Sequence, residues 1–179
     1  MNLYEWLNLT IMAISVLCVA GSLFYLAKQV QLFSKANQDN HDWRRRIATQ
    51  HVLDEDRKLN TDGLNIKFGF ANRKSPIPLE EMLRAFKEEP SLQMDLHKLL
   101  NSYEGLANGV FFGTYDEKII KVNRSSSMQK EFTRCRYYID HRRNETSRTA
   151  WSGYQKLIEK WQNDDMKSIH LEPTGNLKT

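Results

Sequence analysis

The sequence has little that could support a disulfide framework or a metal centre. It contains two cysteines in 179 residues, Cys18 and Cys135, and five histidines scattered at positions 41, 51, 97, 141 and 170. Two cysteines provide neither a set of cross-links nor a zinc site of the usual spacing. His51 and Asp54 fall on one helical face near Asp56, but no second group of ligands follows elsewhere. The sequence therefore predicts no metal site.

The local signatures of the common enzyme classes are also missing. There is no glycine-rich phosphate loop, nucleophile elbow or HExxH motif, so we expect no enzyme and no cofactor. The net charge is only +4, and acidic residues are interleaved with the basic ones, which gives no evidence for DNA or RNA binding. A membrane-tethered hydrolase is the third functional hypothesis, and it would require His51, Asp54 and Glu104 to meet in one pocket.

Charge is absent from one long stretch near the amino terminus. Between Glu5 and Lys28 the sequence reads WLNLTIMAISVLCVAGSLFYLA, and about 20 such residues cross the hydrocarbon core as a helix. A cleaved signal peptide would have a basic start, a shorter apolar run and a small-residue cleavage site, none of which fits. We expect a retained transmembrane helix at 6–27 that contacts the lipid bilayer. The basic flank, from Lys28 to Arg46, predicts an external amino terminus and a cytoplasmic remainder, as in a bacterial inner (plasma) membrane.

The composition divides the chain into five parts. We expect a short external tail at 1–5, the transmembrane helix at 6–27, a juxtamembrane stalk at 28–42, a cytoplasmic helical domain at 43–162 and a polar, flexible tail at 163–179. The stalk contains SKANQDNHD, which has almost no apolar residue and therefore cannot dock on a core. It forms either a continued helix or a loose linker.

Hydrophobic spacing in the domain predicts an all-α fold. A first helix, over 43–59, would carry Trp43, Ile47 and Leu53 inward. The clearest element begins at Ser91 as N-cap, follows a stripe of leucines and ends at Gly113. Further helices are expected at 79–89, at 114–122, after the RSSS sequence at 124–127, where Met128, Phe132, Cys135 and Ile139 form a buried stripe, and at 146–161, where Ala150, Tyr154, Leu157 and Trp161 point inward.

One segment conflicts with this pattern. Residues 64–70, LNIKFGF, alternate strictly between apolar and other residues, which is the period of a strand. No second strand is evident, and a lone strand leaves its hydrogen bonds unmet. The segment would either pair with its own copy in a dimer or be bent by tertiary packing into extended or helical structure.

Three stretches together resemble a known bacterial family: LLNSYEGLANGVFFGTYDEKII (99–120), the upstream WRRRIATQHVLDED and the distal YQKLIEKW (154–161). The family has no known function and is common in prophages and other mobile elements. Its members are similar in having a membrane helix followed by a small helical domain. The resemblance spans roughly 43–161 and implies an architecture and a phage-conflict context. It implies no activity, so no catalytic residue is transferred.

The stretch RCRYYIDHRRN, 134–144, is the main candidate for a ligand site. On a helix, Asp140 can pair with Arg136 and Arg143. This leaves a group that an anion or a nucleotide would suit, because arginine forks and aromatic rings bind such ligands. The group consists of Arg134, Tyr138, His141 and Arg142. The alternative is a solvated helix face with no ligand.

A second candidate surface lies on the leucine-rich helix. Gly105 and Gly109 are one turn apart beside Phe112, opposite the leucine stripe. Glycines in a helix cost about 1 kcal/mol each relative to alanine, and close approach of a second helix, from another subunit, would compensate. A tolerated defect explains them equally well. Glu104, at the edge of the apolar stripe, would form a salt bridge to an arginine or act as a catalytic carboxylate.

These features favour a single-pass membrane protein whose cytoplasmic helical domain mediates interactions. It would form a homo-oligomer, bind a protein partner and act in phage defence or superinfection exclusion. The alternative hypothesis is a ligand-gated membrane effector. Its domain would sense a nucleotide second messenger, such as a cyclic oligonucleotide, and perturb the membrane.

Overall fold

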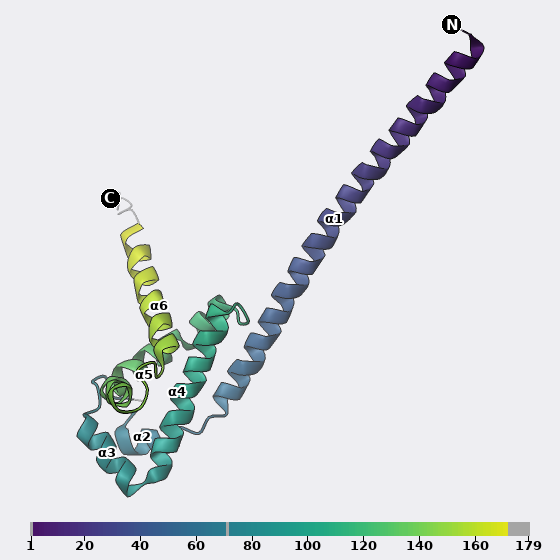
Figure 1. Cartoon of the computed structure of the whole chain (residues 1–179). Helices are drawn as coiled ribbons and strands as arrows, with labels where there is room; N and C mark the ends of the chain where they lie inside the picture. The colour runs from purple at the N-terminus through teal and green to yellow at the C-terminus, as the bar shows by residue number, and fades with distance from the viewer. Residues whose placement is uncertain (1, 71, 172–179) are drawn as a thin grey trace, which may run out of the picture. The chain divides into compact units, whose positions relative to one another are not determined.

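The computed structural model describes residues 2–70 and 72–171. In this part of the chain there are six helices and no strand, so the all-α prediction is confirmed (Figure 1). The helices, in chain order, are α1 (Leu3–Arg57), α2 (Asp62–Phe68), α3 (Leu79–Glu88), α4 (Pro90–Phe111), α5 (Glu117–Glu145) and α6 (Ser152–Leu171).

Helix α1 contains the uncharged amino-terminal segment. From Trp6 onward it is long and apolar enough to cross a membrane, and its large apolar side chains, such as Leu17 and Phe24, are exposed. The chain divides into two compact units, Met1–Arg44 and Arg45–Thr179. The polar stretch 34–42 is helical. Residues 163–171 belong to α6, and 172–179, the rest of the predicted polar tail, lie outside the described residues.

The carboxyl-terminal part of α1 belongs to the second unit and buries a different face from the one predicted. Leu53 is buried as expected, but Trp43 and Ile47 are 62% and 49% exposed. The buried residues are instead Thr49, Leu53 and Asp56, whose spacing of four and three defines one helical face. The spacing of apolar residues predicts that Trp43 and Ile47 point inward. The buried face contains a threonine and an aspartate, which a pattern of apolar residues does not detect.

Residues 64–70 form a helix and a turn, so the strand is not formed and the alternative of helical structure is confirmed. Leu64 and Phe68 are both buried, one helical turn apart, whereas Ile66 is 86% exposed. Gly69 ends α2 in the left-handed conformation, with φ of 64°, which glycine adopts without strain. The chain then turns and buries Phe70. The apparent alternation therefore arises from two buried residues on one face of α2, Leu64 and Phe68, and from Phe70, which is buried after the turn.

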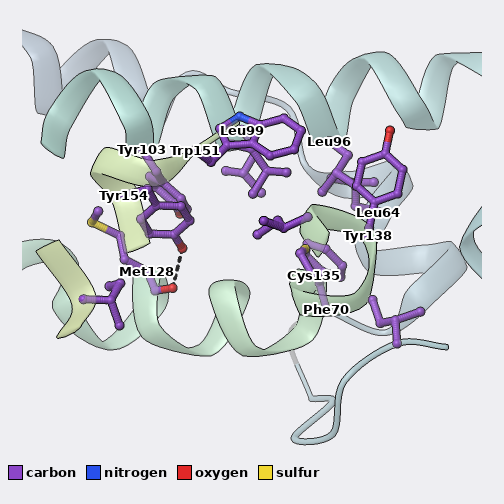
Figure 2. Packing of buried hydrophobic residues seen from close by; sticks show 14 of the residues in the cluster. Leu64, Phe70, Leu96, Leu99, Tyr103, Met128, Cys135, Tyr138, Trp151 and Tyr154 are labelled. Atoms are coloured by element: carbon purple, nitrogen blue, oxygen red, sulfur yellow. Dashed lines mark hydrogen bonds between the residues drawn. The ribbon is translucent and has the colours of Figure 1, made fainter. Parts of the chain in front are cut away.

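Helix α4 is the centre of the domain and contacts α2, α3, α5 and α6. Its predicted stripe is buried, from Leu92 through Leu96 and Leu99 to Leu106. The close view shows Leu96 and Leu99 among the aromatic rings of Tyr138 from α5 and of Trp151, which directly precedes α6 (Figure 2). Ser91 is not the N-cap, because the helix begins at Pro90. Proline suits a first helical position, where its missing N–H would have no partner.

Helix α5 is continuous, whereas the sequence pattern predicted a break at the three serines. Polar side chains in this stretch bond back to the helix: Asn123 Nδ2 donates to the carbonyl of Ile119 at 2.8 Å, and Ser127 Oγ donates to that of Arg124 at 3.0 Å. Such local bonds satisfy these polar groups inside a helix. The predicted stripe of Met128, Cys135 and Ile139 is buried, with Phe132 packed against the core.

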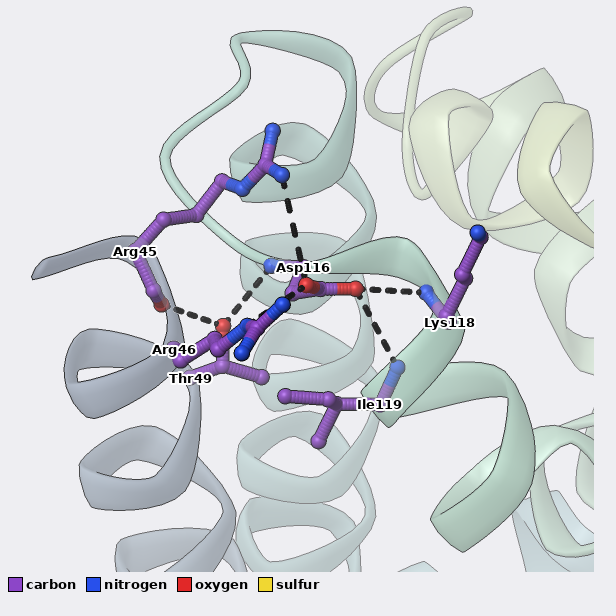
Figure 3. A network of polar contacts seen from close by, with 6 residues as sticks. All are labelled: Arg45, Arg46, Thr49, Asp116, Lys118 and Ile119. Carbon is purple, nitrogen blue, oxygen red and sulfur yellow. Dashed lines mark hydrogen bonds and ion pairs between the residues drawn. The ribbon is translucent and has the colours of Figure 1, made fainter. Parts of the chain in front are cut away.

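Asp116 joins the start of α5 to the end of α1 (Figure 3). Its side chain accepts from the backbone N–H of Lys118 at 3.0 Å, as an N-cap does. Its own backbone N–H donates to Thr49 Oγ1 at 2.7 Å, and Arg45 and Arg46 each lie 4.0 Å from its carboxylate. The buried Thr49 thus has a specific role: it satisfies a backbone donor of a different element.

Helix α6 completes the core. Tyr154, Leu157 and Trp161 are fully buried, as predicted, and Ala150, just before the helix, packs partly against them. The Tyr154 hydroxyl donates to the carbonyl of Met128 (Figure 2). A buried tyrosine hydroxyl requires such a partner, so this bond fixes how α6 lies on α5.

Candidate functional site

A cavity of about 360 Å³ lies where α4, α5 and α6 meet. Helix α4 contributes His97, Asn101 and Glu104, α5 contributes Arg142, and the segment from Thr146 to Trp151, which leads into α6, forms the rest. The volume is within the range of small-molecule sites. The cavity therefore combines a cation, an imidazole, an amide and several hydroxyl groups in one place.

Glu104 supports one side of this cavity by capping α6. Its Oε1 accepts from the backbone N–H of Gly153 at 3.0 Å and its Oε2 from that of Tyr154 at 2.7 Å. A carboxylate at a helix amino terminus is stabilised by the unpaired N–H groups and by the helix dipole. Gly153 leaves space for this contact, since a Cβ there would lie only 2.9 Å from Glu104 Oε1. No ion pair between Glu104 and an arginine is seen among the described residues, so the expected salt bridge is replaced by a helix cap.

The segment before α6 is held in place from two sides. Arg143 donates from Nε to the carbonyl of Ala150 at 2.8 Å and from Nη2 to that of Trp151 at 3.2 Å. On the other side, Trp151 Nε1 donates to Asn101 Oδ1 at 2.9 Å. Trp151 has a φ of 53°, a left-handed conformation that costs a non-glycine residue on the order of 1–3 kcal/mol and is found most often at functional sites.

His97 connects the cavity to the core through Tyr138. Its Nε2 lies 2.7 Å from the Tyr138 hydroxyl, which also accepts from Gln93 Nε2 at 3.1 Å. Because the Tyr138 oxygen accepts a hydrogen bond from Gln93, its own O–H can donate a hydrogen bond to His97 Nε2. In that arrangement the imidazole is neutral and carries its proton on Nδ1. Burial, and secondly the charge of Arg142, lower the pKa of His97. Burial raises the pKa of Tyr138, so both groups stay uncharged near neutral pH.

Arg142 is the one cation among the residues that line this cavity. It is half-buried, and its guanidinium makes no hydrogen bond or ion pair with any residue that the structure describes. The one acidic residue among the described residues that line the cavity, Glu104, forms no ion pair with Arg142 and instead accepts from backbone N–H groups of α6. Arg142 therefore presents its donors to the cavity.

The four predicted ligand residues do not all meet here. Arg142 lines the cavity, and Tyr138 lies behind His97, in contact with it. His141 is next to Tyr138, with ring centroids 6.5 Å apart, and pairs with Glu145 at 3.1 Å. Arg134 is buried elsewhere, where its Nε donates to the carbonyl of Arg73 at 2.6 Å. Asp140 lies 3.9 Å from both Arg136 and Arg143, as the spacing predicted.

Sequence reasoning missed His97, Asn101 and Trp151. His97 and Asn101 are four residues apart at the border of the leucine stripe, so they lie on one face of α4. A polar pair in that position was a signal that could have been used. The left-handed conformation of Trp151 had no signal, because tryptophan seldom adopts it.

The three predicted interface residues differ in their surroundings. Gly109 is covered within the chain, since a Cβ there would lie 2.0 Å from the ring of Tyr115. Gly105 has no side chain or other atom within 4 Å of such a Cβ, and Phe112 is 83% exposed. Intrachain packing thus explains one glycine, and the other two positions remain open on the surface.

The acidic cluster near the end of α1 forms a structural ion pair. Asp56 is buried, pairs with Arg124 at 2.7 Å and accepts from Ser102 Oγ at 2.7 Å. His51 and Asp54 are exposed. No group of three potential metal ligands occurs among the described residues. Glu104 is occupied by α6, so the convergence that a hydrolase would require is not seen for this triad.

Comparison with known proteins gives one match. The family described as Domain of unknown function (DUF4760) matches residues 10–161, which includes most of the apolar segment and the whole of the cavity. No curated protein and no solved structure matches the chain. The match covers most of the sequence, and the chain therefore belongs to the DUF4760 family, whose function is unknown.

Proposed function

We propose that this protein is a membrane-anchored sensor whose helical domain binds a small anionic ligand in the cavity between α4, α5 and α6. The free guanidinium of Arg142 inside a built cavity carries this proposal. A half-buried arginine without a described partner has lost part of its hydration, and a bound anion would compensate for that loss.

The charge of the cavity indicates the class of ligand. The lining, as far as the structure describes it, carries one cation, Arg142, a neutral imidazole and one carboxylate, Glu104, which is directed at the amino terminus of α6. This balance suits a group with no more than a single negative charge, such as a phosphodiester or a carboxylate. The hydroxyls of Ser147 and Thr149 add donors at the edge. A phosphodiester is the linkage of cyclic oligonucleotides, so a nucleotide second messenger is one ligand of this chemistry. Arg142 would contact this ligand, Tyr138 would hold His97 in place from behind the cavity, and Arg134 would not contact the same molecule.

The anchor gives the sensor its place of action. The apolar part of α1 would cross the inner membrane, with the basic residues after Ala27 on the cytoplasmic side. Ligand binding would then act on the membrane or on a membrane partner through a change between two states of the domain, which requires tighter binding to one of them. A role in phage defence rests on the family resemblance alone.

The first test is a thermal-melt screen of the full-length protein in detergent against cyclic dinucleotides, cyclic oligoadenylates and mononucleotides. A ligand at 100 times its dissociation constant stabilises a fold by about 2.7 kcal/mol, which is a shift of a few degrees for a protein of this size. We expect one compound to give this shift and Arg142→Gln to abolish it.

The matched control is Arg148→Gln, a nearby exposed arginine that does not line the cavity. It should leave the shift unchanged. A shift that survives in Arg142→Gln would remove the cavity from the proposal, and the absence of any shift would leave the domain as a protein-interaction module.

A second candidate function is self-association through the exposed end of α4. Phe112 and Phe111 are 83% and 47% exposed, and Gly105 leaves an open surface two turns earlier. Adjacent exposed apolar side chains form a patch of the kind that marks a protein–protein contact. Phe112→Ser should reduce the particle mass measured by mass photometry, whereas Val122→Ser, a control that is 85% exposed, should not. An unchanged mass in Phe112→Ser would remove this surface as an interface.

A further inference from the structure

A second cavity, of about 440 Å³, lies between α5 and the segment that joins α2 to α3. Its charged lining residues are Arg73, Lys74, Lys130 and Arg134. The other described residues that line it are uncharged polar ones, such as Gln129 and Thr133, and none of them is acidic. This basic cavity shares no lining residue with the cavity of the proposed sensor.

Arg134 is held rigidly in this basic cavity. Its side chain and main chain both bind the α2–α3 segment: Nε donates to the carbonyl of Arg73 at 2.6 Å, and the Arg134 carbonyl accepts from Ile77 N–H at 2.9 Å. The guanidinium carbon lies 6.0 Å from the centroid of the Phe70 ring. Arg134 is only 6% exposed. Its position is therefore fixed before any ligand arrives.

The terminal nitrogens of Arg134 are left without a partner. Among the described residues, the Arg134 side chain makes one hydrogen bond, through Nε. No carboxylate oxygen of these residues lies within 4.0 Å of its nitrogens, so it forms no ion pair. Glu131, three residues earlier, forms no ion pair with Arg134, and its Oε2 is itself buried without a hydrogen-bond partner. A buried cation without a counter-charge is costly. An anion in the cavity would supply that charge and accept from both Nη groups.

The other cations indicate how much negative charge the cavity accepts. Arg73 is already neutralised, because Glu81 accepts from its Nη1 at 2.7 Å and its Nη2 at 3.1 Å. Lys74 and Lys130 are exposed and make no ion pair with a described residue. Lys130 lies one helical turn before Arg134 on α5, so their side chains share a face. Three cations are thus available to one ligand.

We propose that this basic cavity binds a phosphate-bearing anion with at least two negative charges, such as a phosphomonoester or a pyrophosphate group. The rigid fork of Arg134 contacts the phosphate oxygens at the inner end, as arginine does in bidentate phosphate binding. Lys74 and Lys130 close over it from the surface. The phosphate belongs either to a soluble molecule or to the headgroup of an anionic phospholipid, which share this chemistry.

The test uses the full-length protein in phosphatidylcholine nanodiscs, titrated with pyrophosphate in a calorimeter. We expect binding with one site per chain and an affinity that falls as salt is added. Arg134→Lys keeps the charge but loses the fork and should weaken binding by roughly tenfold or more. Lys130→Gln changes an exposed side chain, so it keeps the fold, and should weaken binding several-fold.

The control is Lys156→Gln, an exposed lysine on α6 that does not line the cavity. It should bind pyrophosphate like the unaltered protein. The proposal is wrong if pyrophosphate does not bind, or if Lys130→Gln and Lys156→Gln bind it equally well. Because the sensor variant Arg142→Gln leaves this cavity intact, it should still bind pyrophosphate, which separates the two proposals.

A second arm identifies the source of the phosphate. The titration is repeated in nanodiscs that also contain phosphatidic acid. Unchanged pyrophosphate binding supports a soluble ligand. Loss of binding in these nanodiscs, at equal ionic strength, supports a lipid headgroup that occupies the same cavity.

Discussion

The ring of Tyr115 lies directly against Gly109, so closely that a Cβ on the glycine would be 2.0 Å from the ring carbon Cδ2. The chain reverses between these two residues, and Gly113, with φ of 71°, makes the turn. The backbone N–H groups of Thr114 and Tyr115 both donate to the carbonyl of Gly109, at 2.9 and 3.0 Å. Gly109 thus allows the connection from α4 to α5 to fold back on the helix.

This contact predicts opposite effects for alanine at the two glycines of α4. Gly109→Ala must displace the Tyr115 ring, and overpacking of this kind costs about 1–3 kcal/mol, which exceeds the gain in helix propensity. Gly105→Ala meets no atom within 4 Å and should stabilise the protein by up to about 1 kcal/mol. Thermal unfolding of both variants measures the difference. If both variants changed the free energy of unfolding by the same amount, the Tyr115 contact would contribute nothing to stability.

Replacement of Glu104 tests the cap on α6. Glu104→Gln keeps the shape of the side chain but loses the negative charge that accepts from Gly153 and Tyr154. We expect a loss of about 1–2 kcal/mol and faster hydrogen exchange of those two amides. Glu80→Gln changes an exposed carboxylate on α3 and should not affect exchange in α6. Unchanged exchange in Glu104→Gln would contradict the capping role.

The raised pKa of Glu131 predicts a contribution to the free energy of unfolding that decreases as pH rises. Burial raises the pKa of Glu131 above its ordinary value, so the folded protein binds this proton more tightly than the unfolded chain does. The contribution is therefore fully present below about pH 4.5, the ordinary value, and is lost as pH rises through the higher pKa of the folded state. Glu131→Gln should be more stable than the unaltered protein at neutral pH.

The measurement for Glu131 is the free energy of unfolding between pH 4 and pH 8 for both proteins, in buffers of equal ionic strength. The difference between the two should grow with pH. A constant difference would mean that the carboxyl group does not change its protonation within this range, and the proposed effect of burial would be wrong.

The lowered pKa of His97 predicts a contribution to the free energy of unfolding that increases as pH rises, opposite to that of Glu131. Burial and Arg142 lower the pKa of His97, so the folded state binds this proton less tightly than the unfolded chain does. Its contribution is present above about pH 6.5, the ordinary value, and is lost as pH falls toward the pKa of the folded state. Arg142→Gln should raise the pKa of His97, as followed by NMR, and Arg148→Gln should not.

The same NMR titration reports on the proposed ligand. An anion beside Arg142 compensates the positive charge that disfavours protonation of His97, so ligand binding should raise the pKa of His97 in the unaltered protein. A ligand that binds without changing this pKa occupies some other part of the domain.

The helical class and most of the core could be predicted from spacing. The leucines of α4, the stripe from Met128 to Ile139 and the inward face of α6 repeat at three and four residues, and local periodicity determines them. The break at the serines of α5 was wrongly predicted because composition there favours a loop. The side chains instead bond to their own helix, which composition does not reveal.

The candidate site could be predicted only in part, because tertiary contacts create it. Arg142 and Tyr138 were identified from their residue types, yet their partner His97 comes from a helix some 40 residues earlier and was separated from them in the sequence. Arg134 was grouped with Arg142 as a near neighbour. The two residues are about two helical turns apart on α5, and they line different cavities.

The buried face at the end of α1 has a consequence for the order of events during synthesis. Thr49 Oγ1 accepts from the backbone N–H of Asp116, 67 residues later. Asp56 accepts from Ser102 and pairs with Arg124, which follow it by 46 and 68 residues. The chain is made from its amino terminus, so the apolar segment leaves the ribosome long before these partners exist. The contacts of α1 with Asp116 and Arg124 therefore cannot form until the start of α5 has been translated. The domain thus assembles late. A mutation that slows the pairing of Asp56 would prolong the time for which the apolar segment of α1 is complete while the domain is still unfolded.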